Sequence, residues 1–142
     1  WKRSGHTGRG RDGCRVPMPW SGSNAPYGWS TNANTWLPMP SNWAEWTVES
    51  EQNDSSSFFT LYRTLLAERH ANPALGAGTM TWNESSDEVL DFSREPGFQC
   101  IVNFGAEKVT VDADAVIASS IPLDTQGKTV SVGRDQAVWL RV

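Results

Sequence analysis

The chain has 142 residues, of which 38% are hydrophobic and 20% are charged, and its formal net charge is −4. This length fits one domain or parts of two, and the composition is that of an ordinary soluble protein. The acidic balance argues against nucleic-acid binding, which needs a cationic surface, and no apolar run reaches the roughly 18 residues of a membrane span. We therefore expect neither nucleic acid nor a membrane as a partner.

The first residues of the chain and its two cysteines indicate what kind of protein the chain belongs to. It opens on Trp1-Lys2-Arg3 without an initiator Met or a signal peptide, so we expect a piece of a longer protein. Cys14 and Cys100 are too few and too far apart for a disulfide scaffold or a zinc motif. Free thiols in a cytoplasmic protein are the expectation. No His, Cys or carboxylate cluster has the spacing of metal ligands, so we predict no metal and no cofactor.

Residues 1–52 are predicted to be irregular. Prolines, glycines, serines and asparagines interrupt every helical or alternating pattern in this region. An irregular segment of this length is typical of a functional loop or of one that lies on a larger body. Five of the eight tryptophans fall here: Trp20, Trp29, Trp36, Trp43 and Trp46. Two interpretations stay open for them, because indole rings stack on sugars but also pack loops that lack regular structure.

Residues 53–71 are predicted to form a helix. Asp54 or one of the serines at 55–57 can cap its first turn by accepting from free backbone N–H groups. Apolar residues then recur at steps of three and four, which gives the helix an apolar stripe. Arg69 and His70 suit the negative end of the helix dipole, and Asn72-Pro73 ends the helix. Neither histidine is proposed as a catalytic base, because His70 closes the helix and is expected to be exposed, and His6 has no identifiable partner.

After Gly76 the sequence changes to short extended runs separated by turn-forming residues. The predicted strands are 79–82, 89–94, 98–104, 108–111, 116–119, 129–132 and 137–142. Six or seven strands at roughly ten-residue spacing, without a helix between them, predict a small antiparallel sandwich.

The segment Gly8 to Trp20, which reads GRGRDGCRVPMPW, carries the strongest functional signal. Arg11 can present parallel N–H donors to a carboxylate or to vicinal hydroxyls. Gly13 permits a positive φ or a close backbone approach, and the two prolines that follow stiffen the segment. The alternative is a structural one, in which Arg11 or Arg15 forms a loop salt bridge with Asp12.

This segment and those that follow it resemble the C-terminal part of α-glucosidases of the α-amylase superfamily, in the branch that holds oligo-1,6-glucosidase, trehalose synthase and sucrose isomerases. The family run is Arg-Asp-x-x-Arg-x-Pro-x-x-Trp, followed by a Gly-Phe-Ser/Thr element, a Trp-Leu/Ile element and a helix that ends in Leu-x-x-Leu-Arg. The matching residues are Arg11, Asp12, Arg15, Pro17 and Trp20, then Gly28-Trp29-Ser30 with Trp in place of Phe, and Trp36-Leu37. The helix departs slightly, reading Leu65-Leu66-Ala67-Glu68-Arg69.

The resemblance implies an α+β fragment: the last loop and last helix of a (β/α)₈ barrel in residues 1–74, then an all-β antiparallel sandwich, called domain C, in residues 75–142. Active sites of such barrels lie in the loops at the C-terminal face. A complete barrel needs roughly 200 residues or more, so it cannot fit in this chain. The apolar stripe of the predicted helix would therefore be buried against the missing N-terminal barrel, which is the expected partner.

For function, the resemblance implies a retaining, exo-acting α-glucosidase that acts on an oligosaccharide or disaccharide. Arg11, with Asp12 in the same motif, is the expected substrate-binding element, and Arg11 would pair with an aspartate of the barrel to hold a terminal glucose. The nucleophile and the acid/base come from earlier barrel strands, so no catalytic residue is assigned and the fragment alone is expected to be inactive. The alternatives are a carbohydrate-binding or structural accessory module, or part of a trehalose synthase or sucrose isomerase that transfers glucose.

Overall fold

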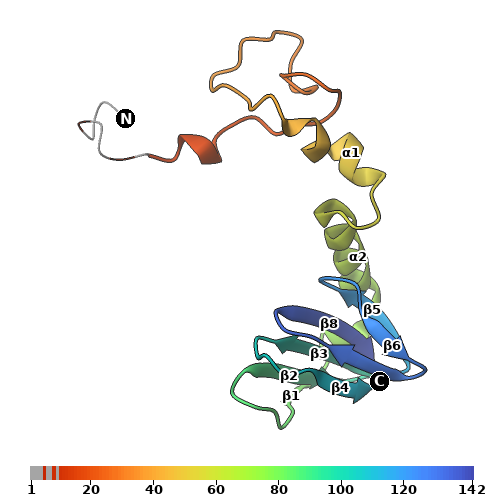
Figure 1. The fold of residues 1–142 in the computed structure, drawn as a ribbon. Helices are drawn as coiled ribbons and strands as arrows, with labels where there is room; N and C mark the ends of the chain where they lie inside the picture. The colour runs from red at the N-terminus through yellow and green to blue at the C-terminus, as the bar shows by residue number, and fades with distance from the viewer. Residues whose placement is uncertain (1–4, 6–7, 9) are drawn as a thin grey trace. The chain divides into compact units, whose positions relative to one another are not determined.

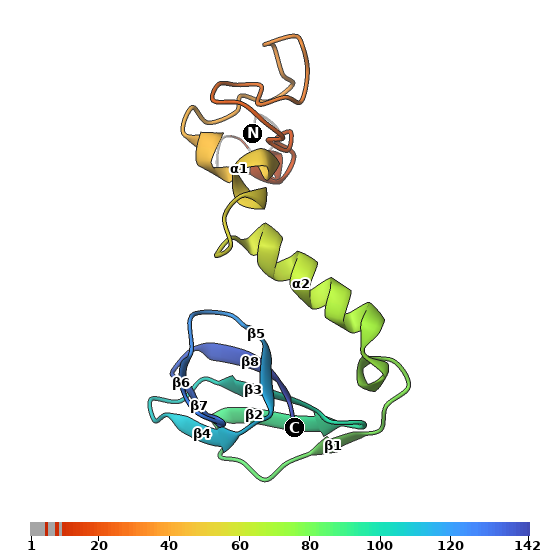
Figure 2. The same ribbon diagram turned by 90° about the vertical axis from the view of Figure 1, so that its right-hand side faces the viewer.

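The computed structural model describes residues 5, 8 and 10–142, and the chain divides into two compact units, Trp1–Thr60 and Leu61–Val142. Figures 1 and 2 show an N-terminal part dominated by loops and a C-terminal part built from strands. The boundary predicted between residues 74 and 75 rests on the resemblance and stays a prediction. No helix in the described part of the chain is long and apolar enough to cross a membrane.

The described residues of the N-terminal unit contain three short helices in an otherwise irregular path. Two are 3₁₀ helices, at Asp12–Cys14 and Trp43–Trp46, and the third is the α-helix α1, Val48–Gln52. Thr47 begins α1, because its hydroxyl accepts a hydrogen bond from the backbone N–H of Ser50 at 3.1 Å. The prediction of an irregular segment up to residue 52 is therefore wrong at its end. A five-residue helix is too short to show a period in the sequence.

The long helix α2 spans Phe58–Ala71, so it begins five residues later than predicted. The preceding polar residues are held outside the helix: the carboxylate of Asp54 accepts from the backbone N–H of Ser56 at 2.8 Å and from its hydroxyl at 2.7 Å. These hydrogen bonds lower the pKa of Asp54. Ser57 then caps the helix, its Oγ accepting from the backbone N–H of Thr60 at 3.1 Å. Side-chain bonds of this kind compete with helical ones and favour caps.

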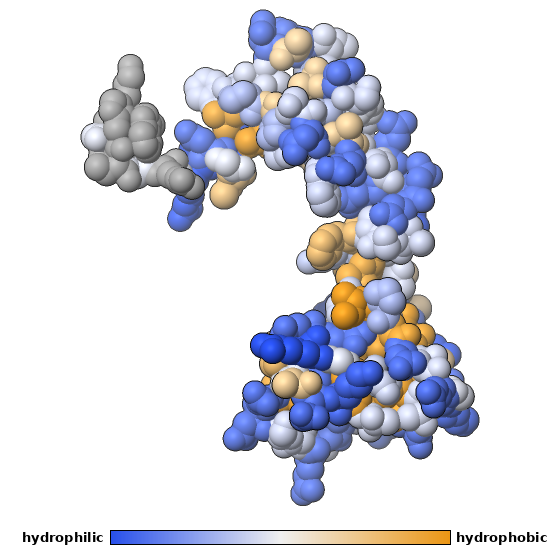
Figure 3. Space-filling view, in the orientation of Figure 1, coloured by the Kyte–Doolittle hydropathy of each residue, from blue (hydrophilic) through white to orange (hydrophobic). Residues whose placement is uncertain are grey.

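Helix α2 ends where the sequence predicts, before Asn72 and Pro73, with Arg69 and His70 in its last turn. Its apolar stripe has little cover within the described residues. Phe58, Tyr62 and Leu66, one turn apart along the helix, are each more than half exposed. Figure 3 shows hydrophobic residues at the surface along this helix.

The strands of the second unit are all antiparallel, as predicted, and form two sheets. The larger sheet has the order β1-β2-β3-β8-β5 and the smaller one the order β4-β7-β6. Their bounds are β1 Met80–Trp82, β2 Val89–Arg94, β3 Phe98–Asn103, β4 Val109–Asp112, β5 Ala115–Ser119, β6 Asp124–Gln126, β7 Thr129–Val132 and β8 Gln136–Arg141. The sandwich is confirmed, while β6 was missed because its three residues are polar and exposed and give no alternation.

Alternation along β3 places its side chains in two separate apolar clusters. Ile101 faces the smaller sheet and packs with Val130, Val132, Val138 and Leu140 in the core between the sheets. Phe98 and Cys100 point to the opposite face, where they pack with Ala74 from the turn that follows α2. Both faces of the larger sheet are therefore covered at its centre.

Asn103, at the end of β3, is a fully buried polar residue that joins the two sheets. Its Nδ2 donates to the carbonyl of Glu107 at 2.8 Å and to that of Val132 on β7 at 3.1 Å. Its Oδ1 accepts from the backbone N–H of Gly105 at 2.9 Å. The amide thus uses both donors and an acceptor, which satisfies backbone groups on two segments, the connection that follows β3 and the end of β7.

Arg94, the last residue of β2, fixes the segment that follows α2 to the larger sheet. Its Nε donates to the carbonyl of Ala74 at 2.6 Å, and its Nη2 donates to the carbonyls of Gly76 at 3.1 Å and Gly78 at 2.9 Å. The guanidinium is suited to this because its planar donors point in fixed directions.

Both cysteines are free, and we expect them to differ in reactivity. Burial raises the pKa of the Cys100 thiol to about 11, whereas Cys14 is exposed. Because the thiolate is the nucleophile, a disulfide reagent at pH 8 should modify one thiol per native chain rapidly and the second only after unfolding. Equal rates for wild type and Cys14→Ser would contradict this assignment.

The same pKa predicts how stability depends on pH. A thiol whose pKa is higher in the folded than in the unfolded chain stabilises the fold below the unfolded value, and this contribution is lost as the pH rises toward the folded value. The free energy of unfolding should therefore fall between about pH 9 and pH 11. The fall should be steeper than in a Cys100→Ala variant, measured by urea unfolding at each pH.

Candidate functional site

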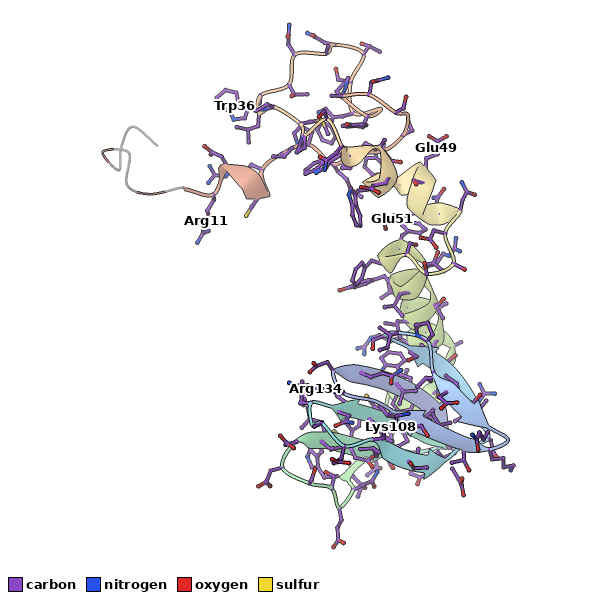
Figure 4. All side chains as sticks on the ribbon, viewed as in Figure 1. Arg11, Trp36, Glu49, Glu51, Lys108 and Arg134 are labelled. Atoms are coloured by element: carbon purple, nitrogen blue, oxygen red, sulfur yellow. The ribbon has the colours of Figure 1, made fainter. Side chains whose placement is uncertain are left out.

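The Arg11–Asp12 motif forms a tight turn of 3₁₀ helix. The backbone N–H of Cys14 donates to the carbonyl of Arg11 and that of Arg15 to the carbonyl of Asp12, each at 3.0 Å. The side chains of this turn are exposed, and Figure 4 shows Arg11 extending away from the ribbon. Arg9 and His6, which precede the turn, lie outside the described residues.

The two arginines of the motif differ in whether they form an ion pair within the described residues. Arg15 Nη1 lies 3.7 Å from Asp12 Oδ1, and both side chains are well exposed. This is the salt bridge that the structural alternative predicts, and an exposed pair of this length contributes little to stability. Arg11 has no ion-pair partner among residues 5, 8 and 10–142. Its fork of donors is therefore available to a group that the described chain does not supply.

The role predicted for Gly13 belongs to a different glycine. Gly13 lies inside the 3₁₀ helix without a positive φ, and a Cβ atom there would meet nothing within 4 Å. Gly10, just before the motif, has φ +65° and supplies the left-handed turn. The sequence pattern offers both glycines and does not distinguish them.

Tyr27 is the centre of the loop that follows, and sequence reasoning missed it. It is fully buried, and its carbonyl accepts from the backbone N–H groups of Trp20 at 2.7 Å and Ser21 at 3.0 Å. Its hydroxyl donates to the carbonyl of Pro40 at 2.8 Å and accepts from the backbone N–H of Trp43 at 3.3 Å. One residue thus joins the two ends of the proline-rich loop, through its backbone carbonyl at one end and its side-chain hydroxyl at the other. The signal available in the sequence was a single tyrosine in a loop segment whose other large aromatic residues are tryptophans.

Gly28 completes this arrangement, and we predict that Gly28→Ala opens the loop. Its φ is +71°, and an added Cβ would lie 2.4 Å from Ser21 Oγ and 3.2 Å from Ser21 N. The unfavourable φ alone costs about 1–2 kcal/mol, and the overlap adds to this. Limited proteolysis between residues 20 and 43 should become at least about tenfold faster, because roughly 1.4 kcal/mol changes the open population tenfold. Gly13→Ala is the matched control; equal proteolysis of both variants would exclude the effect.

The tryptophans of the loop are largely at the surface of the described chain. Trp36 is 91% exposed, and Trp20, Trp29 and Trp46 are each about half exposed. Figure 4 shows Trp36 on the outer side of its loop. Exposed indole rings suit both interpretations, because they can stack on a sugar or pack against another protein surface.

No catalytic group was predicted in this chain, and among residues 5, 8 and 10–142 no carboxylate forms an ion pair with Arg11. His70 is exposed in the last turn of α2. Within the described part of the chain, no three His, Cys, Asp or Glu side chains gather closely enough to hold a metal ion. The described residues thus provide an arginine-bearing loop that presents hydrogen-bond donors at its surface.

Comparisons with known proteins agree with the sequence motifs. Residues 2–78 match the family model of the alpha amylase catalytic domain. The chain is 36% identical over 105 residues to a probable alpha-glucosidase of Rhizobium meliloti, covering 72% of this chain and 19% of that protein. It is 31% identical over 133 residues to a glucan 1,6-alpha-glucosidase of Streptococcus dysgalactiae, covering 92% of this chain and 25% of that protein. The chain therefore spans about a fifth to a quarter of the length of these relatives.

Solved structures extend the similarity to the fold. A trehalulose synthase from Pseudomonas mesoacidophila aligns with a TM-score of 0.68 at 25% identity, over 92% of this chain and 26% of that one. An isomaltulose synthase from Klebsiella aligns with a TM-score of 0.71 at 22% identity, over 92% of this chain and 25% of that one. These alignments run through both the loop-rich unit and the sandwich. Since the family model matches more than half of the chain, the protein belongs to the family of the alpha amylase catalytic domain.

Proposed function

We propose that this chain is the C-terminal part of a retaining, exo-acting α-glucosidase that hydrolyses malto- or isomalto-oligosaccharides. The observation that carries the proposal is the 36% identity to a probable alpha-glucosidase, which includes most of this chain. A glucan 1,6-alpha-glucosidase and a probable oligo-1,6-glucosidase of Bacillus subtilis are further relatives at 31% and 30% identity. The proposed location is the cytoplasm, where the two free thiols would stay reduced.

Arg11 is the residue that we propose to bind substrate, with Asp12 beside it. The guanidinium is exposed and has no ion pair among the described residues, while Asp12 faces Arg15 at 3.7 Å. In the whole enzyme Arg11 would donate to an aspartate from the preceding part of the protein and to hydroxyls of the terminal glucose. Two parallel donors hold a sugar ring in one orientation, which suits an enzyme that removes a single terminal unit.

The reaction itself needs groups that this chain does not supply. Retaining glycosidases use a carboxylate nucleophile about 5–5.5 Å from a carboxylic acid that serves as acid and base. In the proposal both belong to the preceding part of the catalytic domain. The residues of this chain would bind and orient the sugar, so the 142-residue chain alone should not hydrolyse glucosides.

A second candidate is a sucrose isomerase or another enzyme that transfers glucose. It is favoured by the solved structures that align, which are a trehalulose synthase and an isomaltulose synthase. Their identities, 25% and 22%, are lower than those of the glucosidases, so we place hydrolysis first. An independent carbohydrate-binding module is disfavoured because four exposed tryptophans, Trp20, Trp29, Trp36 and Trp46, lie in the loop unit, whereas the sandwich contributes Trp82 at the edge strand β1.

The test is an assay of the full-length gene product that contains this chain. Maltose, isomaltose and p-nitrophenyl α-glucoside should release glucose, first as the α-anomer in NMR spectra. Conversion of sucrose to an isomer without net glucose release would instead support the second candidate. Activity of the isolated 142-residue chain would refute the proposal that its site is incomplete.

A further inference from the structure

The motif that carries Arg11 ends at Trp20, and both backbone groups of this residue are bonded. Its N–H donates to the carbonyl of Tyr27 at 2.7 Å, and its carbonyl accepts from the N–H of Glu49 at 3.0 Å. The carbonyl of Pro19 accepts from the first N–H of α1 at 3.2 Å. Pro19 and Trp20 are therefore fixed between Tyr27 and α1, and we call these two residues the anchor.

The hydroxyl of Tyr27 holds the chain segment that leads into α1. It donates to the carbonyl of Pro40 at 2.8 Å and accepts from the N–H of Trp43 at 3.3 Å. Trp43 begins the 3₁₀ helix that runs to Trp46, and Thr47 then caps α1. The helix that donates to the anchor is thus itself held by the Tyr27 hydroxyl, so the hydrogen bonds close into a ring that passes through one buried side chain.

Residues 16–18, between the Arg11 turn and the anchor, form an arm with little conformational freedom. The rings of Pro17 and Pro19 fix two φ angles. Val16 and Met18 each precede a proline, which restricts their backbones to extended conformations. A stiff arm carries the guanidinium of Arg11 in a direction that is set where the arm is attached, which is the anchor.

From these observations we infer that Tyr27 and Glu49 are positioning residues, which hold the anchor so that the arm presents Arg11 to the substrate in one direction. The inference rests on the proposed function, in which Arg11 binds the terminal glucose. Tyr27 is fully buried, so it acts through Arg11 and does not touch the sugar itself. The effect can be large, because a misplacement of about 1 Å in a group that orients the substrate can cost roughly a hundredfold in rate.

A double-mutant cycle in the full-length gene product distinguishes this role from a general structural one. Tyr27→Phe keeps the aromatic ring and the backbone carbonyl but removes both hydrogen bonds of the hydroxyl. It should lower kcat/KM for p-nitrophenyl α-glucoside about tenfold. In the Arg11→Ala background the same change should lower kcat/KM less than about twofold, because a residue that acts through Arg11 then has nothing to position. No loss in the wild-type background, or a further tenfold loss in the Arg11→Ala background, would overturn the inference.

Two more variants complete the cycle. Tyr62→Phe is the matched control, since it removes the same hydroxyl from a side chain that is 63% exposed, and it should keep kcat/KM within about twofold of wild type. Glu49→Ala loosens the anchor from the side of α1, because Glu49 Oε2 accepts from the N–H of Gly22 at 3.0 Å. It should lower kcat/KM about threefold in the wild-type background and leave Arg11→Ala unchanged, so the cycle does not depend on how well Tyr27→Phe folds. Equal losses in both backgrounds, or in Tyr62→Phe and Tyr27→Phe, would contradict the positioning role.

Hydrogen exchange followed by mass spectrometry tests the inference without an activity readout. The peptide of residues 10–18 should exchange at least about fivefold faster in Tyr27→Phe than in wild type, because a single 3₁₀ turn is not stable unless its arm is held. A peptide from β3 in the sandwich should exchange equally in both. The faster exchange is expected even if the full-length protein proves not to be an α-glucosidase. Unchanged exchange of residues 10–18 would overturn the inference even in an active α-glucosidase.

Discussion

Replacing Arg11 with alanine should abolish most of the activity of the full-length enzyme while its fold is retained. In the proposed site the guanidinium makes two charge-assisted hydrogen bonds, each contributing about 1.5–3 kcal/mol. Their loss in the transition state corresponds to roughly a 10²- to 10⁴-fold decrease in kcat/KM, at 1.36 kcal/mol for each factor of ten. The melting temperature should hardly change, because the Arg11 side chain is exposed and makes no ion pair within the described residues. Steady-state kinetics and a thermal melt measure the two effects.

Arg11→Lys and Arg134→Ala complete this experiment. Lysine keeps the charge but cannot present two parallel donors, so Arg11→Lys should restore less than about a tenth of the lost activity. Arg134 is an exposed arginine of the sandwich that lies 3.4 Å from Asp135, and its alanine variant should keep full activity. Wild-type turnover in Arg11→Ala would remove Arg11 from the site and leave the family assignment untouched.

Replacing Asn103 with alanine should be the most damaging single change in the sandwich. The substitution removes hydrogen bonds to the carbonyls of Glu107 and Val132 and from the N–H of Gly105. Each bond contributes about 1 kcal/mol, and leaving buried partners unpaired costs more, so we expect a loss of about 3–5 kcal/mol. That is a large part of the 5–15 kcal/mol by which domains are usually stable.

Urea unfolding followed by the fluorescence of Trp139, which packs edge to face on Phe98 in the second cluster, would measure this loss. Gln126→Ala on the exposed strand β6 is the control, with an expected change within about 0.5 kcal/mol. If both variants unfold at the same urea concentration, the amide of Asn103 does not hold the two sheets together.

The fold could be predicted where local chemistry and tertiary structure agree. The end of α2 follows from Asn72 and Pro73, and seven of the strands follow from alternation that matches a sheet with a buried face. The start of α2 could not be placed, because Asp54 and Ser57 are equally good caps by residue type. Strand β6 exists only through its pairing with β7, which no local pattern reveals.

The candidate site was predictable in part because its residues form a recognisable sequence motif, even though their local structure is ordinary. The Arg11–Asp12 motif is specific as a sequence, although in the described chain it is simply an exposed turn with a weak ion pair to Arg15. Tyr27 was not found, because its importance lies in contacts with Trp20, Pro40 and Trp43, which are distant in sequence. A pocket made by several segments cannot be derived from one of them.

The three hydrogen bonds from Arg94 have a consequence for how this sandwich can be separated from the rest of the enzyme. A shortened chain that starts at Thr79 would lose the carbonyls of Ala74, Gly76 and Gly78. The guanidinium of Arg94 would then have lost these three acceptors. It would also uncover Phe98 and Cys100 where Ala74 now seals them. Proteases should therefore spare this junction, and gene fusions or domain exchanges should be joined upstream of Asn72.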